Sequence, residues 1–229
     1  TGKTKILWQG SKVNTRQGVY YPWSFADSIT LDEKKQILYW AGRAPGRNAP
    51  TAFYSFDLNK KKSAPKQVPG VIISRGRQIG QSAVINGTLY VSSIREGIWA
   101  FPLTSKKSKA QLWVKLKDFG RGNIRGPAFD IKGKKVYFAV GPDIFEGPIS
   151  NPSTSKKIFS LNFCCSTIWG LALNPKGNQL LVTGYKIKGV GNRGANLYAK
   201  DLSAPNATVQ SVYYGRSSSA SKNLIVIED

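Results

Sequence analysis

Arginine is the residue type in this chain whose chemistry is most informative. The sequence holds 34 lysines and arginines against 12 aspartates and glutamates, which gives a formal net charge of +22. An arginine side chain is a planar fork that binds a phosphate, sulfate or carboxylate through two parallel hydrogen bonds, whereas lysine is a strongly hydrated point charge. The charge excess therefore predicts an acidic partner, and it leaves open an acidic glycan, another polyanion, a nucleic acid or an acidic protein.

Glycine accompanies most of the arginines, as in Arg75-Gly76-Arg77 and Gly120-Arg121-Gly122. Glycine permits unusual backbone angles and lets a ligand approach main-chain N–H groups closely. Trp23 and Trp169 lie near segments that are expected to be loops. An indole ring there offers a stacking surface for a sugar or a base. The candidate ligand-binding residues are therefore Arg43, Arg47, Arg75, Arg77, Arg95, Arg121, Arg125, Arg193, Arg216, Lys186, Trp23 and Trp169.

Other reactive residue types are scarce. The chain has no histidine, which removes catalytic triads, histidine-bound zinc and the usual general base. Its two cysteines, Cys164 and Cys165, are adjacent, so no Cys-x-x-Cys metal site exists. The pair is open to three interpretations: buried thiols, redox-active thiols or a vicinal disulfide. We predict the vicinal disulfide, because oxidation is favoured in a secreted chain.

The elements that position these residues form a repeat of about 45 to 50 residues. Each copy contains an apolar residue followed by an aromatic one, at Phe53-Tyr54, Ile98-Trp99, Ile144-Phe145 and Leu197-Tyr198. Within each copy, an earlier β-like segment precedes this pair, and a turn such as Asn86-Gly87 leads into that segment. The earlier segments cover residues 37–40, 89–91, 136–138 and 180–182. The repeat therefore predicts hairpin-linked strands rather than helices.

Two further strands complete each copy. The first strands are expected within residues 27–31, 82–85, 127–131 and 170–173, and the fourth strands within 66–71, 111–116, 157–161 and 209–214. Four short strands per repeat are the blade of a β-propeller, whereas a two-sheet sandwich would not give four similar copies. Residues 5–9 and 223–227 would supply two strands of a closing blade split between the two ends of the chain. We thus expect one all-β domain over residues 1–229, a β-propeller of about five blades.

Residues 29–40, which read ITLDEKKQILYW, resemble the YWTD-type repeats of lipoprotein-receptor propellers and the related NHL-type repeats. The Thr-Asp ending of that signature is replaced by Ala41-Gly42. The resemblance implies an extracellular binding scaffold. Glycosylation sequons begin at Asn86 and Asn206 and agree with a secreted glycoprotein. No apolar run approaches the ~18 residues of a membrane span, so no transmembrane segment is expected.

In a propeller, the loops between second and third strands and between blades lie on one face. The expected strand boundaries place every arginine in loops of this kind and most lysines on the opposite face. This segregation predicts a non-enzymatic protein that binds a sulfated, heparin-like or uronic glycan through an arginine face, without catalytic residues, cofactor or metal. The alternatives are a nucleic-acid partner or arginines that merely pair with carboxylates such as Asp118 and Glu96.

An enzyme is the less favoured interpretation. A propeller-type lactonase or hydrolase needs carboxylates near its channel, often with a metal, and the candidates are Asp27, Asp118 and Asp130. The remaining tryptophans have a simpler expectation. Strand positions predict that Trp8, Trp40, Trp99 and Trp113 pack between blades.

Overall fold

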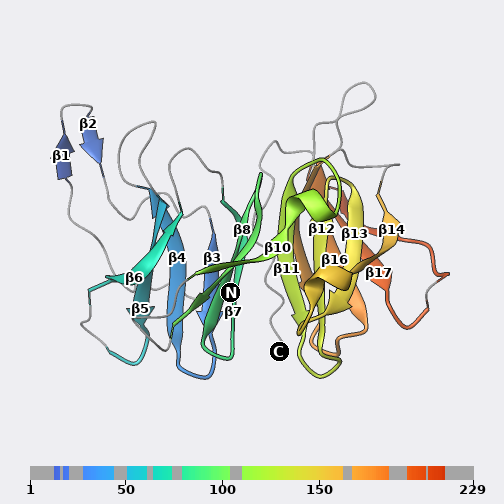
Figure 1. Cartoon of the computed structure of the whole chain (residues 1–229), viewed down its shortest axis with the longest axis horizontal. Helices are drawn as coiled ribbons and strands as arrows, with labels where there is room; N and C mark the ends of the chain where they lie inside the picture. The colour runs from blue at the N-terminus through green and yellow to red at the C-terminus, as the bar shows by residue number, and fades with distance from the viewer. Residues whose placement is uncertain are drawn as a thin grey trace. The chain divides into compact units, whose positions relative to one another are not determined.

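A computed structural model describes residues 13–15, 18–20, 28–43, 51–60, 64–73, 79–103, 110–161, 167–185, 195–204 and 206–214. The described chain is all β: it contains strands and two short 3₁₀ helices and no α-helix (Figure 1). Within it, no helix has the length and apolar character needed to cross a membrane. The chain divides into two compact units, residues 1–77 and 78–229.

The first unit contains one four-stranded sheet and one short hairpin. The sheet is an antiparallel meander in the order β3-β4-β5-β6. Its strands are β3 (Ile29–Asp32), β4 (Ile37–Arg43), β5 (Thr51–Asp57) and β6 (Lys66–Ile73). The hairpin pairs β1 (Val13–Thr15) with β2 (Gly18–Tyr20), and the sequence patterns did not predict it.

The second unit contains three four-stranded meanders. The first is built from β7 (Ile79–Ile85), β8 (Thr88–Ser93), β9 (Gly97–Pro102) and β10 (Gln111–Lys115). The 3₁₀ helix η1 (Leu116–Asp118) leads to the next, β11 (Ile124–Asp130), β12 (Lys135–Val140), β13 (Asp143–Pro148) and β14 (Lys156–Ser160), with η2 (Pro152–Thr154) between the last two strands. The third holds β15 (Thr167–Leu173), β16 (Gln179–Tyr185), β17 (Ala195–Asp201) and β18 (Gln210–Tyr214).

The four predicted repeats are therefore the four sheets, and the predicted strand order within each is confirmed. Tight turns explain why these segments form hairpins. Asn86 and Gly87 both have positive φ, 49° and 73°, as a two-residue hairpin turn requires. The predicted strands at 5–9 and 223–227 lie outside the described residues, as do Trp8, Cys164 and Cys165.

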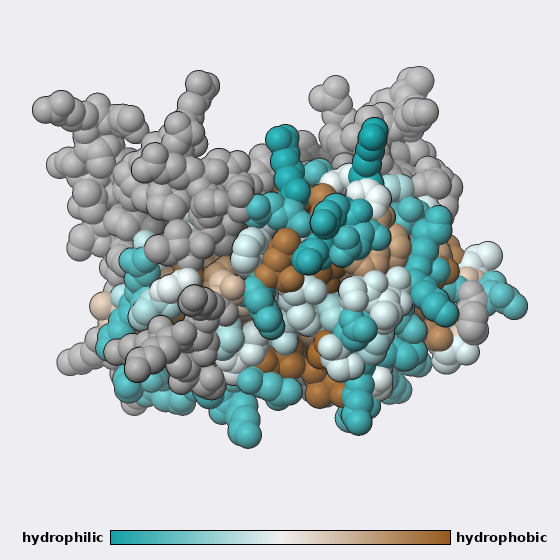
Figure 2. Space-filling view, in the orientation of Figure 1, coloured by the Kyte–Doolittle hydropathy of each residue, from teal (hydrophilic) through white to brown (hydrophobic). Residues whose placement is uncertain are grey.

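Apolar side chains between neighbouring sheets form the core of the second unit. The first strands of the three sheets, β7, β11 and β15, contact one another. Inner strands contact one another in this way around the axis of a propeller. Further out, Trp113 packs on Tyr90 and Phe129 with ring centroids 4.6 and 5.8 Å away, so its predicted packing role between blades is confirmed. On the face drawn in Figure 2, hydrophilic residues are interspersed with intermediate and apolar areas of the described surface.

Candidate anion-binding site

Four of the predicted ligand-binding residues have described side chains: Arg95, Arg121, Arg125 and Trp169. Arg43 is the last residue of β4 instead of part of the following loop, and its side chain is not described. The remaining predicted residues lie outside the described part of the chain. They are Arg47, Arg75, Arg77, Arg193, Arg216, Lys186 and Trp23.

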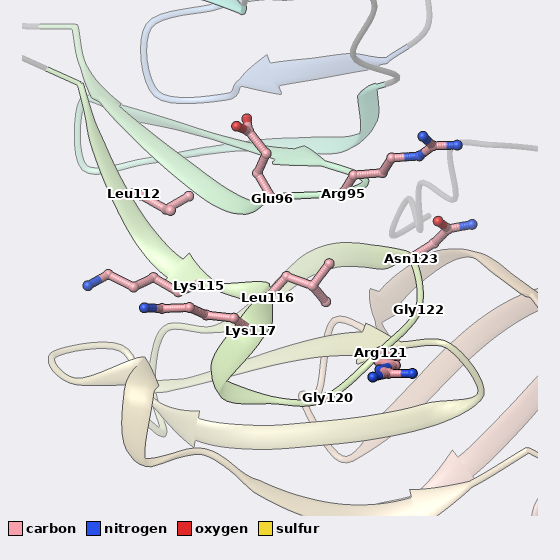
Figure 3. Close-up of a pocket in the computed structure, with 10 residues that line it drawn as sticks. All are labelled: Arg95, Glu96, Leu112, Lys115, Leu116, Lys117, Gly120, Arg121, Gly122 and Asn123. Atoms are coloured by element: carbon pink, nitrogen blue, oxygen red, sulfur yellow. The ribbon is translucent and has the colours of Figure 1, made fainter.

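Arg95 and Arg121 lie at one pocket of about 680 Å³, which is formed where the first and second sheets of the second unit adjoin (Figure 3). Arg95 comes from the turn between β8 and β9, and Arg121 from the loop before β11. Two lysines that are close in sequence, Lys115 and Lys117, also line the pocket. The full lining is Arg95, Glu96, Leu112, Lys115, Leu116, Lys117, Gly120, Arg121, Gly122 and Asn123.

Backbone contacts fix the turn that carries Arg95. Gly97 has a φ of 147°, and a Cβ there would lie 1.9 Å from the carbonyl oxygen of Val114. Only glycine allows β9 to approach β10 so closely at this point. One residue beyond Lys115, the Leu116 N–H donates to the carbonyl oxygen of Glu96 over 2.9 Å. The arginine turn and the lysine segment are thus held to each other by the backbone.

The loop that carries Arg121 is anchored at both ends. At its start, the Phe119 ring packs edge-on against Phe138 and Phe145, with centroids 4.9 and 5.2 Å away. At its end, the Ile124 N–H donates to the carbonyl oxygen of Ile94 over 3.0 Å. Gly122, with a φ of 140°, permits the close approach to the next turn, because a Cβ there would lie 2.9 Å from the backbone nitrogen of Gly141. The exposed Arg121 therefore rises from a well-fixed backbone.

The pocket is strongly cationic. Its lining holds four basic residues and one carboxylate, that of Glu96. Oε2 of Glu96 accepts hydrogen bonds from Ser93 Oγ over 3.1 Å and Trp99 Nε1 over 3.2 Å. The ion pairs found in the described part of the chain all use lysines and lie elsewhere: Lys60–Asp57, Lys135–Glu146 and Lys157–Asp143.

The cations are spread along the pocket. Figure 3 shows Lys115 and Lys117 extending side by side in one direction, while Arg95 extends the opposite way. Leu112 and Leu116 add apolar surface to the lining. Separated positive charges with apolar surface between them suit a ligand that carries several negative groups along its length, rather than one small ion.

Arg125 does not line this pocket, and its predicted place in a loop between blades is wrong. It lies within β11, paired with Ala139 of β12, and is buried. Its Nε donates to the carbonyl oxygen of Ile168 over 3.2 Å, and its guanidinium carbon lies 5.4 Å from the centroid of the Trp169 ring. Burial lowers the pKa of Arg125 to about 10. Trp169 likewise lies within a strand, β15, and the contact with Arg125 occupies one face of its ring.

The carboxylates considered for an enzyme do not converge. Asp118 lies in η1 before β11, whereas Asp130 ends that strand and accepts the Gly133 N–H over 2.8 Å. The seven-residue strand β11, about 20 Å long, therefore lies between Asp118 and Asp130. Asp27 lies outside the described residues, and no group of three or more His, Cys, Asp or Glu within the described ranges is placed to hold a metal.

Sequence reasoning did not name the two lysines of the pocket, Lys115 and Lys117, as ligand-binding residues. Lys115 lines the pocket, but at the end of a predicted strand it has no feature that separates it from the other surface lysines. Gln81, in the buried β7, hydrogen-bonds to the backbone of Leu171 in β15. Only the register of the sheets places those two residues together, since they are 90 positions apart.

Comparisons with known proteins show the fold. No family model and no curated protein matches this sequence. Among solved structures, TolB from Acinetobacter baumannii is similar over 82% of this chain, with a TM-score of 0.59 and 12% identity. The structure of putative TolB from Agrobacterium tumefaciens is similar over 85%, with a TM-score of 0.60 and 12% identity. Oligogalacturonate lyase from Vibrio parahaemolyticus is similar over 86%, with a TM-score of 0.54 and 10% identity.

The similarity covers 43% of the Acinetobacter protein, 69% of the Agrobacterium protein and 56% of the lyase. The chain thus spans less than half the length of the first of these proteins. The TolB-like neighbours are β-propellers, and the four sheets of this chain are propeller blades, as predicted.

Proposed function

We propose that this chain is a secreted, non-enzymatic β-propeller protein that binds a sulfated or uronic-acid glycan. The observation that carries the proposal is the pocket between two adjoining sheets, whose lining includes Arg95, Lys115, Lys117 and Arg121. The one carboxylate in its lining, Glu96, already accepts hydrogen bonds from neighbouring side chains. A polyanion is the partner that would neutralise these cations.

The chemistry of the lining favours a glycan with several acidic groups. Each arginine can bind a sulfate or carboxylate with two hydrogen bonds, and such charged hydrogen bonds contribute about 1.5–3 kcal/mol each. Leu112 and Leu116 would contact the C–H face of a sugar ring between the charged groups. The lyase among the fold neighbours is an enzyme for an oligogalacturonate, so this type of fold is compatible with an acidic glycan.

A nucleic-acid partner has less support from the described pocket. Proteins that bind single strands present aromatic rings on which bases stack. No aromatic residue is among those that line this pocket in the described part of the chain. The nearest aromatic side chains in sequence, Trp113 and Phe119, pack against other rings between the blades. The lining therefore offers charge and apolar surface but no stacking platform.

The proposal is tested by competitive elution from a heparin column at physiological salt. We expect a sulfated or uronic oligosaccharide to elute the wild-type chain at lower concentration than single-stranded or double-stranded DNA of equal charge. Attraction by bulk charge is screened as salt rises, so a specific pocket also predicts retention above physiological ionic strength. Elution by DNA at the lower concentration would contradict the proposal, and so would loss of retention at physiological salt.

Secretion is a separate part of the proposal. Asn86 and Asn206, the asparagines of the two sequons, are both exposed in turns, where a glycosyltransferase can reach them. Expression through a eukaryotic secretory pathway should therefore yield a chain whose intact mass falls on treatment with an N-glycosidase. An unmodified mass would remove this support for secretion without affecting glycan binding.

A further inference from the structure

Arg125 lies at the junction of three inner strands. It is 5% exposed and belongs to β11, which contacts β7 on one side and β15 on the other. Its neighbours come from both of these strands. Ile168 and Trp169 belong to β15 and hold the guanidinium through a hydrogen bond and a ring contact. All of these residues lie within the second unit.

In the described part of the chain, no carboxylate forms an ion pair with this buried guanidinium. The hydrogen bond to the Ile168 carbonyl uses Nε, so it does not occupy the two terminal nitrogens. The lowered pKa of Arg125 has burial as its cause, with no opposing carboxylate. A buried charge without an opposite charge is strongly unfavourable, and a bound anion would remove that cost.

The surrounding backbone makes room for the guanidinium. At Gly80 in β7, a Cβ would lie 3.0 Å from Nη1 and 3.2 Å from Cδ of Arg125. One hydrogen-bond donor at the same junction lacks an acceptor within the described residues: Nε1 of Trp169 is buried and unpaired. An unpaired buried donor in contact with a buried guanidinium is an unusual cost in a folded core.

We propose that Arg125 anchors an internal site for a single oxyanion, a carboxylate, sulfate or phosphate group, at the junction of β7, β11 and β15. The terminal nitrogens of Arg125 bind the anion, and Trp169 packs against the guanidinium and orients it. This site is separate from the pocket of Arg95 and Arg121, because Arg125 is not among the residues that line it. It takes one anionic group, whether from a free ion or from an acidic sugar.

The test compares anions by thermal unfolding of the full chain, using sodium sulfate, phosphate and galacturonate against sodium chloride at equal ionic strength. The wild type should be stabilised by at least one of the three probes, with a dissociation constant measurable by calorimetry. In Arg125→Met that constant should rise at least tenfold, because both terminal hydrogen bonds are lost. Stabilisation by sulfate or phosphate through exclusion from the surface is common to both proteins and cancels in the comparison.

The probes separate the two sources of the anion. A response to galacturonate but not to the inorganic ions assigns the site to a sugar acid, and a response to sulfate or phosphate alone assigns it to a free ion. Either supports the site. A response of equal size in wild type and Arg125→Met would overturn it.

The stability of Arg125→Met in chloride distinguishes an anion site from a purely structural role of the arginine. Methionine fills similar volume without a charge, so Arg125→Met should be as stable as wild type, or more stable, when no oxyanion is present. A large loss of stability in chloride would instead show that the arginine holds the strands together, and would overturn the proposal. A second variant, Arg125→Lys, keeps the charge without the fork and should lose most of the oxyanion response.

The pocket variant Arg95→Ala/Arg121→Ala keeps the two inferences apart. It should retain the response to small oxyanions while it loses affinity for heparin. The reverse pattern, with heparin binding intact and no oxyanion response in the wild type, would refute the internal site and leave the proposed function standing.

Discussion

The side-chain amide of Gln81 binds both backbone groups of Leu171. Its Nε2 donates to the Leu171 carbonyl oxygen over 2.6 Å, and the Leu171 N–H donates to its Oε1 over 2.9 Å. The side chain is buried, so no solvent competes for these hydrogen bonds. One glutamine therefore joins β7 to β15, two inner strands of different sheets, next to the junction that holds Arg125.

Replacing this glutamine should weaken the whole second unit. Gln81→Ala leaves the Leu171 N–H and carbonyl buried without partners, which costs about 2–4 kcal/mol. Urea unfolding measures the loss. Gln111→Ala is the matched control, since Gln111 is exposed on β10 and should change the free energy of unfolding by less than about 0.5 kcal/mol. Equal effects of the two substitutions would show that the Gln81 link contributes nothing.

Gly80→Ala should disturb the Arg125 junction directly. The added methyl would lie 2.4 Å from Ser92 Oγ and 3.0 Å from Arg125 Nη1, in a region where both neighbours are buried. We expect a loss of about 1–3 kcal/mol in urea unfolding, as overpacking of a core typically gives. The oxyanion response should fall as well. Wild-type stability together with a wild-type response would mean that the side chain of Arg125 does not lie against Gly80.

The pH dependence of stability offers an independent test of Arg125 burial. The pKa of Arg125 is lowered from 12.5 to about 10. Between these values the unfolded state binds more protons than the folded state, so the contribution of this residue to the free energy of unfolding rises with pH. Relative to Arg125→Met, the wild type should gain about 1 kcal/mol between pH 9 and pH 11 in chloride. A difference that is constant over this range would contradict the lowered pKa.

The geometry of the arginine forks can be tested without changing the charge. Arg95→Lys/Arg121→Lys keeps the charge of the pocket but removes the planar forks that bind an acidic group with two hydrogen bonds. Affinity for a sulfated oligosaccharide should fall about tenfold or more while retention on a simple cation exchanger stays unchanged. If both quantities are unchanged, the arginines act only as point charges.

Much of the fold was accessible from the sequence, because the signals are local. Turn pairs such as Asn86-Gly87 and alternating apolar residues such as those of 136–138 specify hairpins within a few positions. Repetition of these signals then indicates blades. The hairpin of β1 and β2 was missed, since its three-residue strands are too short to show alternation.

The site was only partly accessible, for a reason that two arginines illustrate. Arg121 and Arg125 are both next to glycine and lie four positions apart, yet one is exposed and the other is buried. The difference arises where β11 begins pairing with β12, at Ile124 and Val140, and that register depends on contacts distant in sequence. Burial of a charged side chain has no local sequence signal, so the sequence predicts a loop position for Arg125.

The central claim is that the pocket of Arg95 and Arg121, rather than the overall charge, binds an acidic glycan. Isothermal titration with a heparin-derived oligosaccharide at physiological salt tests it most directly, on the wild type, Arg95→Ala/Arg121→Ala and a charge-matched control, Lys132→Ala/Lys176→Ala. The control residues are exposed in the turns β11–β12 and β15–β16. We predict that the pocket variant binds at least about 100-fold more weakly, from two lost charged contacts, and that the control stays within about threefold of wild type. Equal losses in the two variants would contradict the account.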